Sequence, residues 1–237
     1  MKYKSEGTST LSFTYDVAGG ENANHLLVII DGEKRIDSYN TIGKSMSYRL
    51  PKGNHTVEFC DTVYGYTNTA LCSYLYDVKV IDFPGASPED IDSTIVKEGS
   101  VPLTWTNDES YPWQIVDGKL RSGNHGFANS TSGVSFKYSS QYPTTLSMSY
   151  EVYGSKSYNN YIRIYVDGEL YKSDYYTSST GGTKTGSISV CLPKGNHSVE
   201  VKYEYTNTTR YYYAYIYNVK VSGITPASTE ELDSITT

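Results

Sequence analysis

The stretch LPKGNHTVEF at 50–59 decides the fold, because it returns almost unchanged as LPKGNHSVEV at 192–201. Three other pairs occur in the same order around it: LSFTYDV and LSMSYEV, VIIDGE and IYVDGE, and YLYDVKV and YIYNVKV. In chain order, the pairs that begin with LSFTYDV, VIIDGE, LPKGNHTVEF and YLYDVKV lie 135, 136, 142 and 141 residues apart. The length differences therefore fall between the segments, where loops belong. Motifs that repeat in order indicate two copies of one folded unit.

Apolar and polar residues alternate within these segments, which is the period of a strand with one buried face. Tight turns are indicated by Asp-Gly at 167–168 and by the PKGN sequence at 193–196. No stretch of comparable length has a helical period. We therefore predict an all-β fold of two tandem antiparallel β-sandwich (jelly-roll) domains, the first lacking its opening strands. The residues expected to face the core of the second copy are Leu146, Met148, Tyr150, Val152, Ile162, Ile164, Val166, Val199, Val201, Tyr203, Ala214 and Ile216.

The two copies differ in completeness. Lys2 and Tyr3 align with Lys137 and Tyr138, so the first copy lacks counterparts of roughly 96–136, a stretch that contains both tryptophans and three expected strands. The expected parts are a first sandwich at 1–83, a linker with a short helical turn at 84–98, a complete second sandwich at 99–223 and a linker-like tail at 224–237.

An incomplete sandwich leaves an uncovered face or edge. Three explanations remain open: the chain was cut from a longer repeat protein, which we favour, the first domain is a smaller variant, or a neighbouring molecule supplies the missing strands. The tail bears on this question, because ASTEELDS at 227–234 repeats ASPEDIDS at 86–93. It would lead toward a further domain or a partner.

Charge and hydropathy exclude two classes of partner. The net charge is −6 with acids and bases interspersed, which argues against nucleic-acid binding through a basic face. No apolar run approaches the 18 or so residues of a membrane span, and no apolar stretch follows the first lysines as in a secretory signal. We expect the parent protein to be extracellular or on a cell surface, or else on the surface of a virion.

Three cysteines do not make a disulfide scaffold. Cys60 and Cys72 would oppose each other if 56–63 and 69–80 formed a hairpin, so a bridge and two free thiols are both open. The second copy has Lys202 and Tyr213 at these positions, and the fold therefore does not require the bond.

The histidines favour structure over catalysis, because His55 and His197 are equivalent residues in the same Gly-Asn-His turn. No nucleophile elbow, phosphate-binding glycine loop, His-Glu-x-x-His or Cys-x-x-Cys pattern occurs. We therefore do not expect an enzyme.

The 26 tyrosines are the better indication of function. If Ala214 and Ile216 face the core, the alternating tyrosines of that strand share its outer side, and the same holds for the strand at 161–165. If the two strands are near neighbours, these side chains form an exposed aromatic patch that binds sugars or a subunit, although tyrosine also suits strands in general. Trp105 and Trp113 flank the loop at 107–110, from which one of them would present a ring to a ligand. The candidate ligand-binding residues are Tyr161, Arg163, Tyr165, Tyr213, Tyr215, Tyr217 and Trp113.

Five segments, in order, resemble the cleaved-adhesin domain family of jelly-roll adhesin repeats, which are related in shape to MAM-like and lectin-like sandwiches. They are LTWTNDESYPW at 103–113, KLRSGN at 119–124, VDG at 166–168, LPKGNH at 192–197 and AYIYNV at 214–219. The resemblance implies calcium association and non-catalytic attachment to host proteins or glycans. In the family the opening strand packs against the sandwich, which implies that at least one of Trp105 and Trp113 lies in the core.

The chain departs from the family pattern near the implied calcium site. Tyr217 and Tyr76 stand where the family has an aspartate, and Asn160 stands where an aspartate usually precedes the central strand. The oxygen ligands that remain for Ca²⁺ are Asn107, Asp108 and Asn218, because this ion accepts amide as well as carboxylate oxygens.

These observations together predict a non-catalytic bacterial surface module for adhesion, with carbohydrate or a cell-surface protein as its ligand. The alternative is a structural subunit of a phage virion or of a surface filament, in which a homo-oligomer or another assembly completes the first copy.

Overall fold

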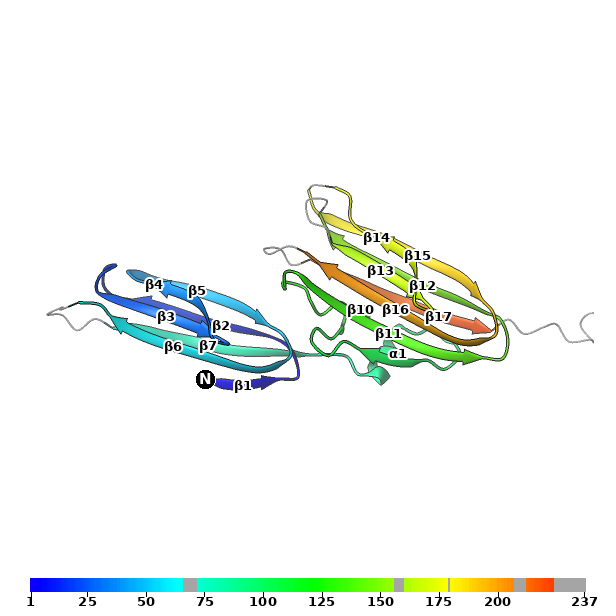
Figure 1. Cartoon of the computed structure of the whole chain (residues 1–237), viewed down its shortest axis with the longest axis horizontal. Coiled ribbons are helices and arrows are strands. Elements are labelled where there is room, and N and C mark those ends of the chain that lie inside the picture. The colour runs from blue at the N-terminus through cyan, green and yellow to red at the C-terminus, as the bar shows by residue number, and fades with distance from the viewer. Residues whose placement is uncertain (66–71, 156–159, 179, 207–211, 224–237) are drawn as a thin grey trace, which may run out of the picture. The chain divides into compact units, whose positions relative to one another are not determined.

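The computed structural model describes the chain except for residues 66–71, 156–159, 179, 207–211 and 224–237 (Figure 1). The chain forms two compact units. Unit 1 comprises Met1–Pro84 with Glu109–Tyr111, and unit 2 comprises Gly85–Asp108 with Pro112–Thr237. Each unit is a sandwich of two antiparallel sheets, which confirms the predicted fold class. In the described residues, no helix has the length and apolar character needed to cross a bilayer.

Unit 2 contains one helix and ten strands in the described residues. One sheet has the strand order β15-β12-β17-β10-β9 and the other has the order β14-β13-β16-β11-β8 (Figure 1). The elements are α1 (Pro88–Ile95), β8 (Thr104–Asn107), β9 (Gln114–Val116), β10 (Lys119–Arg121), β11 (Ser130–Ser140), β12 (Thr144–Gly154), β13 (Tyr161–Val166), β14 (Glu169–Asp174), β15 (Gly182–Leu192), β16 (Gly195–Tyr205) and β17 (Tyr213–Gly223).

The core of unit 2 lies between these two sheets. Residues alternate along each long strand between this core and the outside, as the burial of β12 and β16 shows. Ile162, Ile164 and Val199 are fully buried, as are Ala214 and Ile216. The strand phase predicted from the sequence is therefore confirmed, and the tyrosines of β17 point to the outer side of their sheet.

Helix α1 belongs to this core rather than to a free linker. It begins after Ser87, whose hydroxyl accepts a 3.1 Å hydrogen bond from the Asp90 backbone N–H, and Pro88 occupies its first turn. Its apolar residues Ile91 and Ile95 are buried in the core of unit 2. The stretch 84–98, which we expected to be a linker with a short helical turn, thus contains a helix that helps to close the second sandwich.

Unit 1 repeats most of this plan with fewer strands. Its sheets have the orders β1-β6-β3-β4 and β5-β2-β7, which match β11-β16-β13-β14 and β15-β12-β17 of unit 2. Strands β8, β9 and β10 have no counterpart among its described residues. The strands are β1 (Lys2–Ser5), β2 (Gly7–Val17), β3 (Asn24–Ile30), β4 (Glu33–Ser38), β5 (Thr41–Leu50), β6 (Gly53–Val63) and β7 (Ser73–Pro84).

The hairpin that would place Cys60 opposite Cys72 does not form, which decides between the two open alternatives in favour of free thiols. Strand β6 lies in one sheet and β7 in the other, because the chain crosses between the layers at this point. Cys60, Cys72 and Cys191 are all free thiols. Alternation along a strand reveals which residues face the core, but it does not reveal to which sheet the next strand belongs.

Candidate functional site

The outer side of the sheet around β17 gathers tyrosines and charges from three strands. Tyr215 pairs with Arg121 of β10 on one side and with Glu151 of β12 on the other, while Tyr213 pairs with Tyr153 of β12. All of these side chains are half-buried, because each packs against its neighbours across the strands. We call the group the tyrosine face; its members are Lys119, Arg121, Glu151, Tyr153, Tyr213, Tyr215 and Tyr217.

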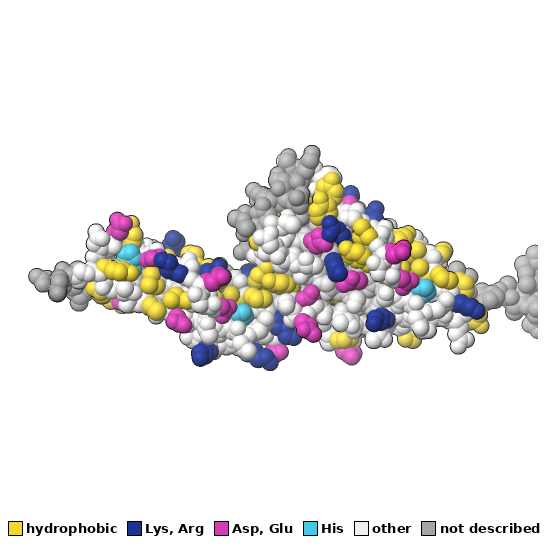
Figure 2. Space-filling view, in the orientation of Figure 1, with side chains coloured by type: hydrophobic (Ala, Val, Ile, Leu, Met, Phe, Trp, Pro, Cys, Tyr) yellow, Lys and Arg dark blue, Asp and Glu magenta, His cyan; other side chains and the backbone are white. Residues whose placement is uncertain are grey.

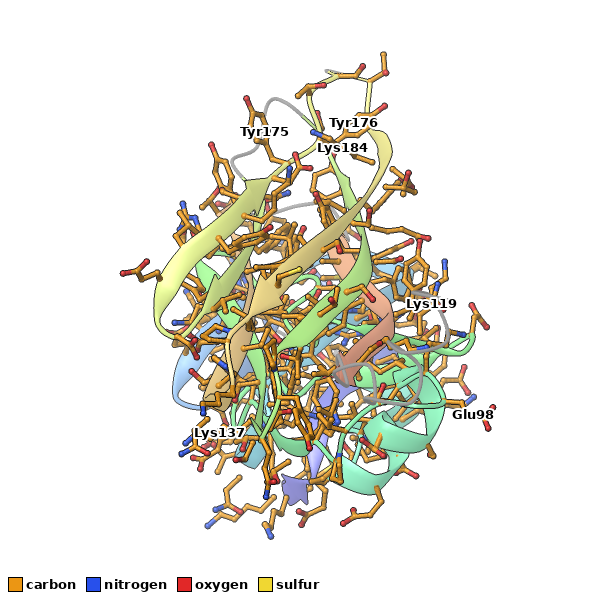
Figure 3. All side chains as sticks on the ribbon, turned by 90° about the vertical axis from the view of Figure 1, so that its right-hand side faces the viewer. Glu98, Lys119, Lys137, Tyr175, Tyr176 and Lys184 are labelled. Carbon is orange, nitrogen blue, oxygen red and sulfur yellow. The ribbon has the colours of Figure 1, made fainter. Side chains whose placement is uncertain are left out.

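Two cations pack on these rings. The Lys119 ammonium lies 5.4 Å from the ring centre of Tyr215 and 4.8 Å from that of Tyr217, and the Arg121 guanidinium lies 5.9 Å from that of Tyr213. Such contacts contribute about 0.5–1 kcal/mol each at exposed sites. Figure 3 shows Lys119 at the side of unit 2, well separated from Lys137.

The rings also pack on one another. Tyr153 stacks on Tyr213 with ring centres 5.1 Å apart, and Tyr213 meets Tyr215 edge-on at 5.2 Å. Offset-stacked and edge-to-face pairs are the arrangements that aromatic rings prefer. The face is therefore ordered before any ligand arrives.

The surroundings of the tyrosine face raise the pKa values of one lysine and two tyrosines. Lys119 donates a 2.6 Å hydrogen bond to Glu151, and this bond raises the pKa of the lysine. Burial raises the pKa of the Tyr213 phenol, and neighbouring phenols add to the effect. Burial and the charge of Glu151 likewise raise the pKa of Tyr217. At neutral pH the phenols of Tyr213 and Tyr217 consequently keep their protons and can donate hydrogen bonds.

Arg121 differs from Lys119 in its partners. Its Nη2 donates a 3.1 Å hydrogen bond to Gln114 Oε1, and among the described residues it forms no ion pair with a carboxylate. A guanidinium in this situation can donate to an acceptor on a ligand.

The predicted binding residues form two rows, one on β17 and one on β13, and the row on β13 lies on the other sheet. Tyr161, Arg163 and Tyr165 project from β13, which pairs with β14 and β16 and not with β17. Here too each ring carries a cation: Arg163 is 5.1 Å from the ring centre of Tyr161, and Lys202 is 5.2 Å from that of Tyr165. Both cations pair with carboxylates of β16, Arg163 with Glu204 and Lys202 with Glu200.

The two rows therefore do not form one patch, because the condition for it, that the two strands are near neighbours, is not met. They lie on the outer sides of opposite sheets of unit 2, because β13 and β17 belong to different layers. Figure 2 shows one face of the molecule, on which hydrophobic side chains are interspersed with charges of both signs.

Trp113 is fully buried and does not present a ring to a ligand. Its backbone N–H donates to Asn107 Oδ1 at 2.7 Å, and Trp105 is also buried, against Phe136. Both tryptophans belong to the core of unit 2, so the prediction of a loop-borne binding ring is wrong.

The residues suggested for calcium do not fit one metal site. Asn107 Oδ1 already accepts from the backbone N–H groups of Asp108 and Trp113, and Asp108 Oδ2 accepts from that of Gly133. Asn218 lies on β17, in the sheet opposite to β8, which carries Asn107. Nor do the described residues bring three or more His, Cys, Asp or Glu side chains within reach of one metal ion.

A groove of about 850 Å³ lies elsewhere on unit 2, beside His197 and Asp167 and lined also by Lys137 and Tyr138. His197 Nδ1 bonds Asp167 at 2.8 Å, and its Nε2 bonds the Pro193 carbonyl at 2.9 Å. His55 makes the same two bonds in unit 1, to Asp31 and to the Pro51 carbonyl. The repetition supports the structural role predicted for both histidines.

Another charged cluster occupies one end of unit 2. Asp174 accepts a 2.8 Å hydrogen bond from the buried Tyr150 hydroxyl and pairs with Lys184, and burial raises the pKa of Tyr150 strongly. Figure 3 shows Lys184 near Tyr175 and Tyr176 at this end. The Asp174 oxygens are occupied within the protein, because Tyr175 N–H also donates to one of them at 2.9 Å.

Sequence reasoning missed four members of the tyrosine face. Lys119 and Arg121 lie on a strand of three residues, which is too short for a period to be recognised. Glu151 and Tyr153 were visible as outward residues of β12, but only the pairing of β12 with β17 brings them to Tyr213 and Tyr215.

Comparison with known proteins gives similarity of structure only. No family model and no curated protein matches the chain, so the cleaved-adhesin resemblance stays a prediction. The secreted serine protease VesC from Vibrio cholerae is similar at 14% identity and a TM-score of 0.46, over 92% of this chain and 48% of that protein, so the chain spans about half of its length.

Two further solved structures are similar. The tandem CBM51 modules of a family 98 glycoside hydrolase from Streptococcus pneumoniae match at 14% identity and a TM-score of 0.32, over 94% of this chain and 80% of theirs. A CBM36-1 domain of a multidomain xylanase from the hindgut metagenome of Trinervitermes trinervoides matches at 16% identity and a TM-score of 0.29, over 53% of this chain and 100% of that domain. These TM-scores carry no functional assignment.

Proposed function

We propose that this protein binds carbohydrate without chemical turnover, through the tyrosine face of unit 2, and that it serves as an extracellular or cell-surface adhesion module. One observation carries the proposal: four tyrosines from adjacent strands lie side by side with Lys119 and Arg121 packed on their rings.

The chemistry of such a surface suits sugars. Tyrosine rings cover the apolar C–H groups of a sugar, and phenol hydroxyls exchange hydrogen bonds with sugar hydroxyls. Arg121 adds N–H donors beside Tyr213. Because the rings of Tyr153, Tyr213 and Tyr215 are already packed, a ligand would lose little free energy in ordering them.

The same face suits a protein partner less well. Tyrosine and arginine are enriched in protein interfaces, but the centres of such interfaces are depleted of charge. The Lys119–Glu151 ion pair lies directly beside Tyr215 and Tyr217. A hydrated, hydroxyl-rich ligand tolerates that pair, whereas burial under a protein would remove its water.

A glycan array followed by calorimetry tests the proposal. The double variant Tyr213→Ser/Tyr215→Ser should weaken binding of the best array glycan at least about tenfold, which corresponds to about 1.4 kcal/mol. The matched control is Tyr161→Ser/Tyr165→Ser, because it removes the same residue type, packed under the same kind of cation, from the opposite sheet.

The control variant should keep the wild-type affinity. Far-ultraviolet circular dichroism and tryptophan fluorescence establish that both variants remain folded. An equal loss of affinity in the two double variants would reject the tyrosine face as the site. Retention of no glycan by the wild-type protein would reject carbohydrate as the ligand.

A further inference from the structure

One side of unit 1 is open where the same side of unit 2 is closed. Val78 and Val80 of β7 are 39% and 37% exposed, whereas Val219 and Val221, at the same positions of β17, are fully buried. Leu75 likewise is 37% exposed, and its counterpart Ile216 is buried. We call Leu75, Val78 and Val80 the open strip; in unit 2 the same row of side chains is part of the core.

The backbone edge beside the open strip is also free. Within the described residues β7 pairs with β2 alone, at the end of its sheet. Strand β17, by contrast, has β10 on its second edge, and the Val219 and Val221 carbonyls accept hydrogen bonds of 2.7 and 2.9 Å from the N–H groups of Lys97 and Val101. An unpaired edge next to exposed apolar side chains is a typical receptor for an added segment.

Unit 2 shows what kind of segment covers such a strip. Helix α1 lies against β8, β9, β10 and β17, and it buries Ile91 and Ile95 in the same core as Val219 and Val221. This helix begins only a few residues after β7. The cover of the second sandwich is thus the sequence that directly follows the first one.

The chain contains a second copy of that covering sequence. After β17, ASTEELDS at 227–234 repeats ASPEDIDS at 86–93. Leu232 stands at the position of Ile91 and Ser228 at that of the helix-capping Ser87. Glu231 is three residues after Ser228, which completes the Ser-x-x-Glu pattern of a helix start.

We propose that residues 227–237 of a second copy of this chain dock as a helix on the open strip of unit 1, with Leu232 in the position that Ile91 holds in unit 2. Each molecule then offers one tail and one open strip. Because these surfaces differ, association is heterologous and runs head to tail into chains of molecules. The contact is weak and concentration-dependent, since a helix of this length is marginal until it is bound.

This proposal is independent of sugar binding, because the open strip belongs to unit 1 and the tyrosine face to unit 2. Sedimentation velocity of the full chain from about 10 µM to about 1 mM tests it, since that range spans weak contacts. The wild-type mass should rise with concentration. Leu232→Ser, which removes the apolar anchor of the tail, and Val80→Glu, which places a charge on the strip, should each remain monomeric.

Ile81→Glu is the matched control, because Ile81 is 52% exposed on the same strand but points to the opposite side from Val80. It should associate as the wild type does. An added peptide of residues 224–237 should dissociate wild-type assemblies and shift the methyl NMR signals of Val78 and Val80, and a scrambled peptide should do neither.

Three results would overturn the proposal. The first is a wild-type protein that remains monomeric over the whole concentration range. If Leu232→Ser then changes the Val78 methyl signal, the tail docks within one molecule and not on a second copy. The second is association that Leu232→Ser leaves intact, as direct pairing of two β7 strands would give. The third is a peptide that leaves the Val78 and Val80 signals unmoved.

Discussion

Strands β7 and β17 carry nearly the same sequence, YLYDVKV and YIYNVKV, but they occupy different environments. In unit 2 the inner residues of β17 are buried and its outer tyrosines pack under Lys119 and Arg121. In unit 1 both sides of β7 are exposed. A strand sequence thus specifies which side chains share a face, whereas neighbouring segments decide whether that face becomes core, binding surface or open edge.

The outer tyrosines illustrate the same point. Tyr74 and Tyr76 stand at the positions of Tyr215 and Tyr217, yet Asp16 and Ala18 replace Glu151 and Tyr153, and the described residues of unit 1 include no counterpart of β10 that supplies cations. Tyr74 is consequently 61% exposed. We therefore assign the proposed glycan site to unit 2 alone.

The largest expected effect concerns a residue that only unit 2 possesses. Trp113→Ala should lower the free energy of unfolding of unit 2 by about 3–5 kcal/mol, because it empties the space of a fully buried ring. Urea unfolding followed by the fluorescence of Trp105 reports on unit 2 selectively, since both tryptophans lie there.

Unit 1 should be unaffected by this change, which amide hydrogen exchange of β2 and β3 can establish. Weakened glycan binding by Trp113→Ala with unchanged stability would instead restore Trp113 as a binding residue and contradict its place in the core.

Two matched valines compare the units directly. Val219→Ala should destabilise unit 2 by about 2 kcal/mol, from about 0.8 kcal/mol for each buried methyl or methylene group and an added cavity. Val78→Ala should change the stability of unit 1 by less than about 0.5 kcal/mol, as at exposed positions in general. Urea titrations read by tryptophan fluorescence for unit 2 and by amide NMR for unit 1 give the two values. Equal losses would mean that the open strip is in fact part of a closed core.

The core of unit 2 and the tyrosine face differ in how much of each could be predicted from the sequence. The alternation around Ile162, Val199 and Ile216 is a local property of each strand, and it correctly predicts the core of unit 2. Which strands become neighbours depends on how the chain crosses between layers, and alternation does not record this. That is why one patch from the rows of Tyr161 and Tyr213, and a hairpin with Cys60 opposite Cys72, could be given only as conditional possibilities.

The loop that opens unit 2 was the hardest part to predict. Trp113, Lys119 and Arg121 lie on or beside strands of three residues, where no period exists. Asn107 was named as an oxygen ligand for the calcium that the family resemblance implies, but its amide instead bonds the backbone of Ala86 and Trp113.

The smallest expected effect is a pH dependence centred on His197. Burial favours the neutral ring, but the hydrogen bonds to Asp167 and to the Pro193 carbonyl outweigh it and raise the pKa of His197 above its ordinary 6.5. Both partners only accept, so both ring nitrogens must carry protons. The contribution of protonated His197 to the stability of unit 2 is therefore fully present below pH 6.5 and is lost as the pH rises through the raised pKa.

Asp167 sets the acid limit of the same stabilisation. Burial alone would raise its pKa, but hydrogen bonds from the Ser198 N–H and from His197 lower it below 3.8, so its contribution is lost as the pH falls below that value. NMR titration of the His197 ring, with tryptophan fluorescence for stability, measures both limits. Asp167→Asn should lower the pKa of His197, and an unchanged titration would contradict the role of this pair. Asp31→Asn in unit 1 is the control and should leave the His197 titration unmoved.

Mapping the site by amide NMR on the intact chain tests the central claim most directly. Titration with the glycan that the array selects should shift signals of β10, β12 and β17 around Arg121, Tyr153 and Tyr215, and leave the matching strands β2 and β7 of unit 1 unmoved. Shifts centred on β13 and β16, or equal shifts in β7 and β17, would contradict the assignment of the site to the tyrosine face of unit 2.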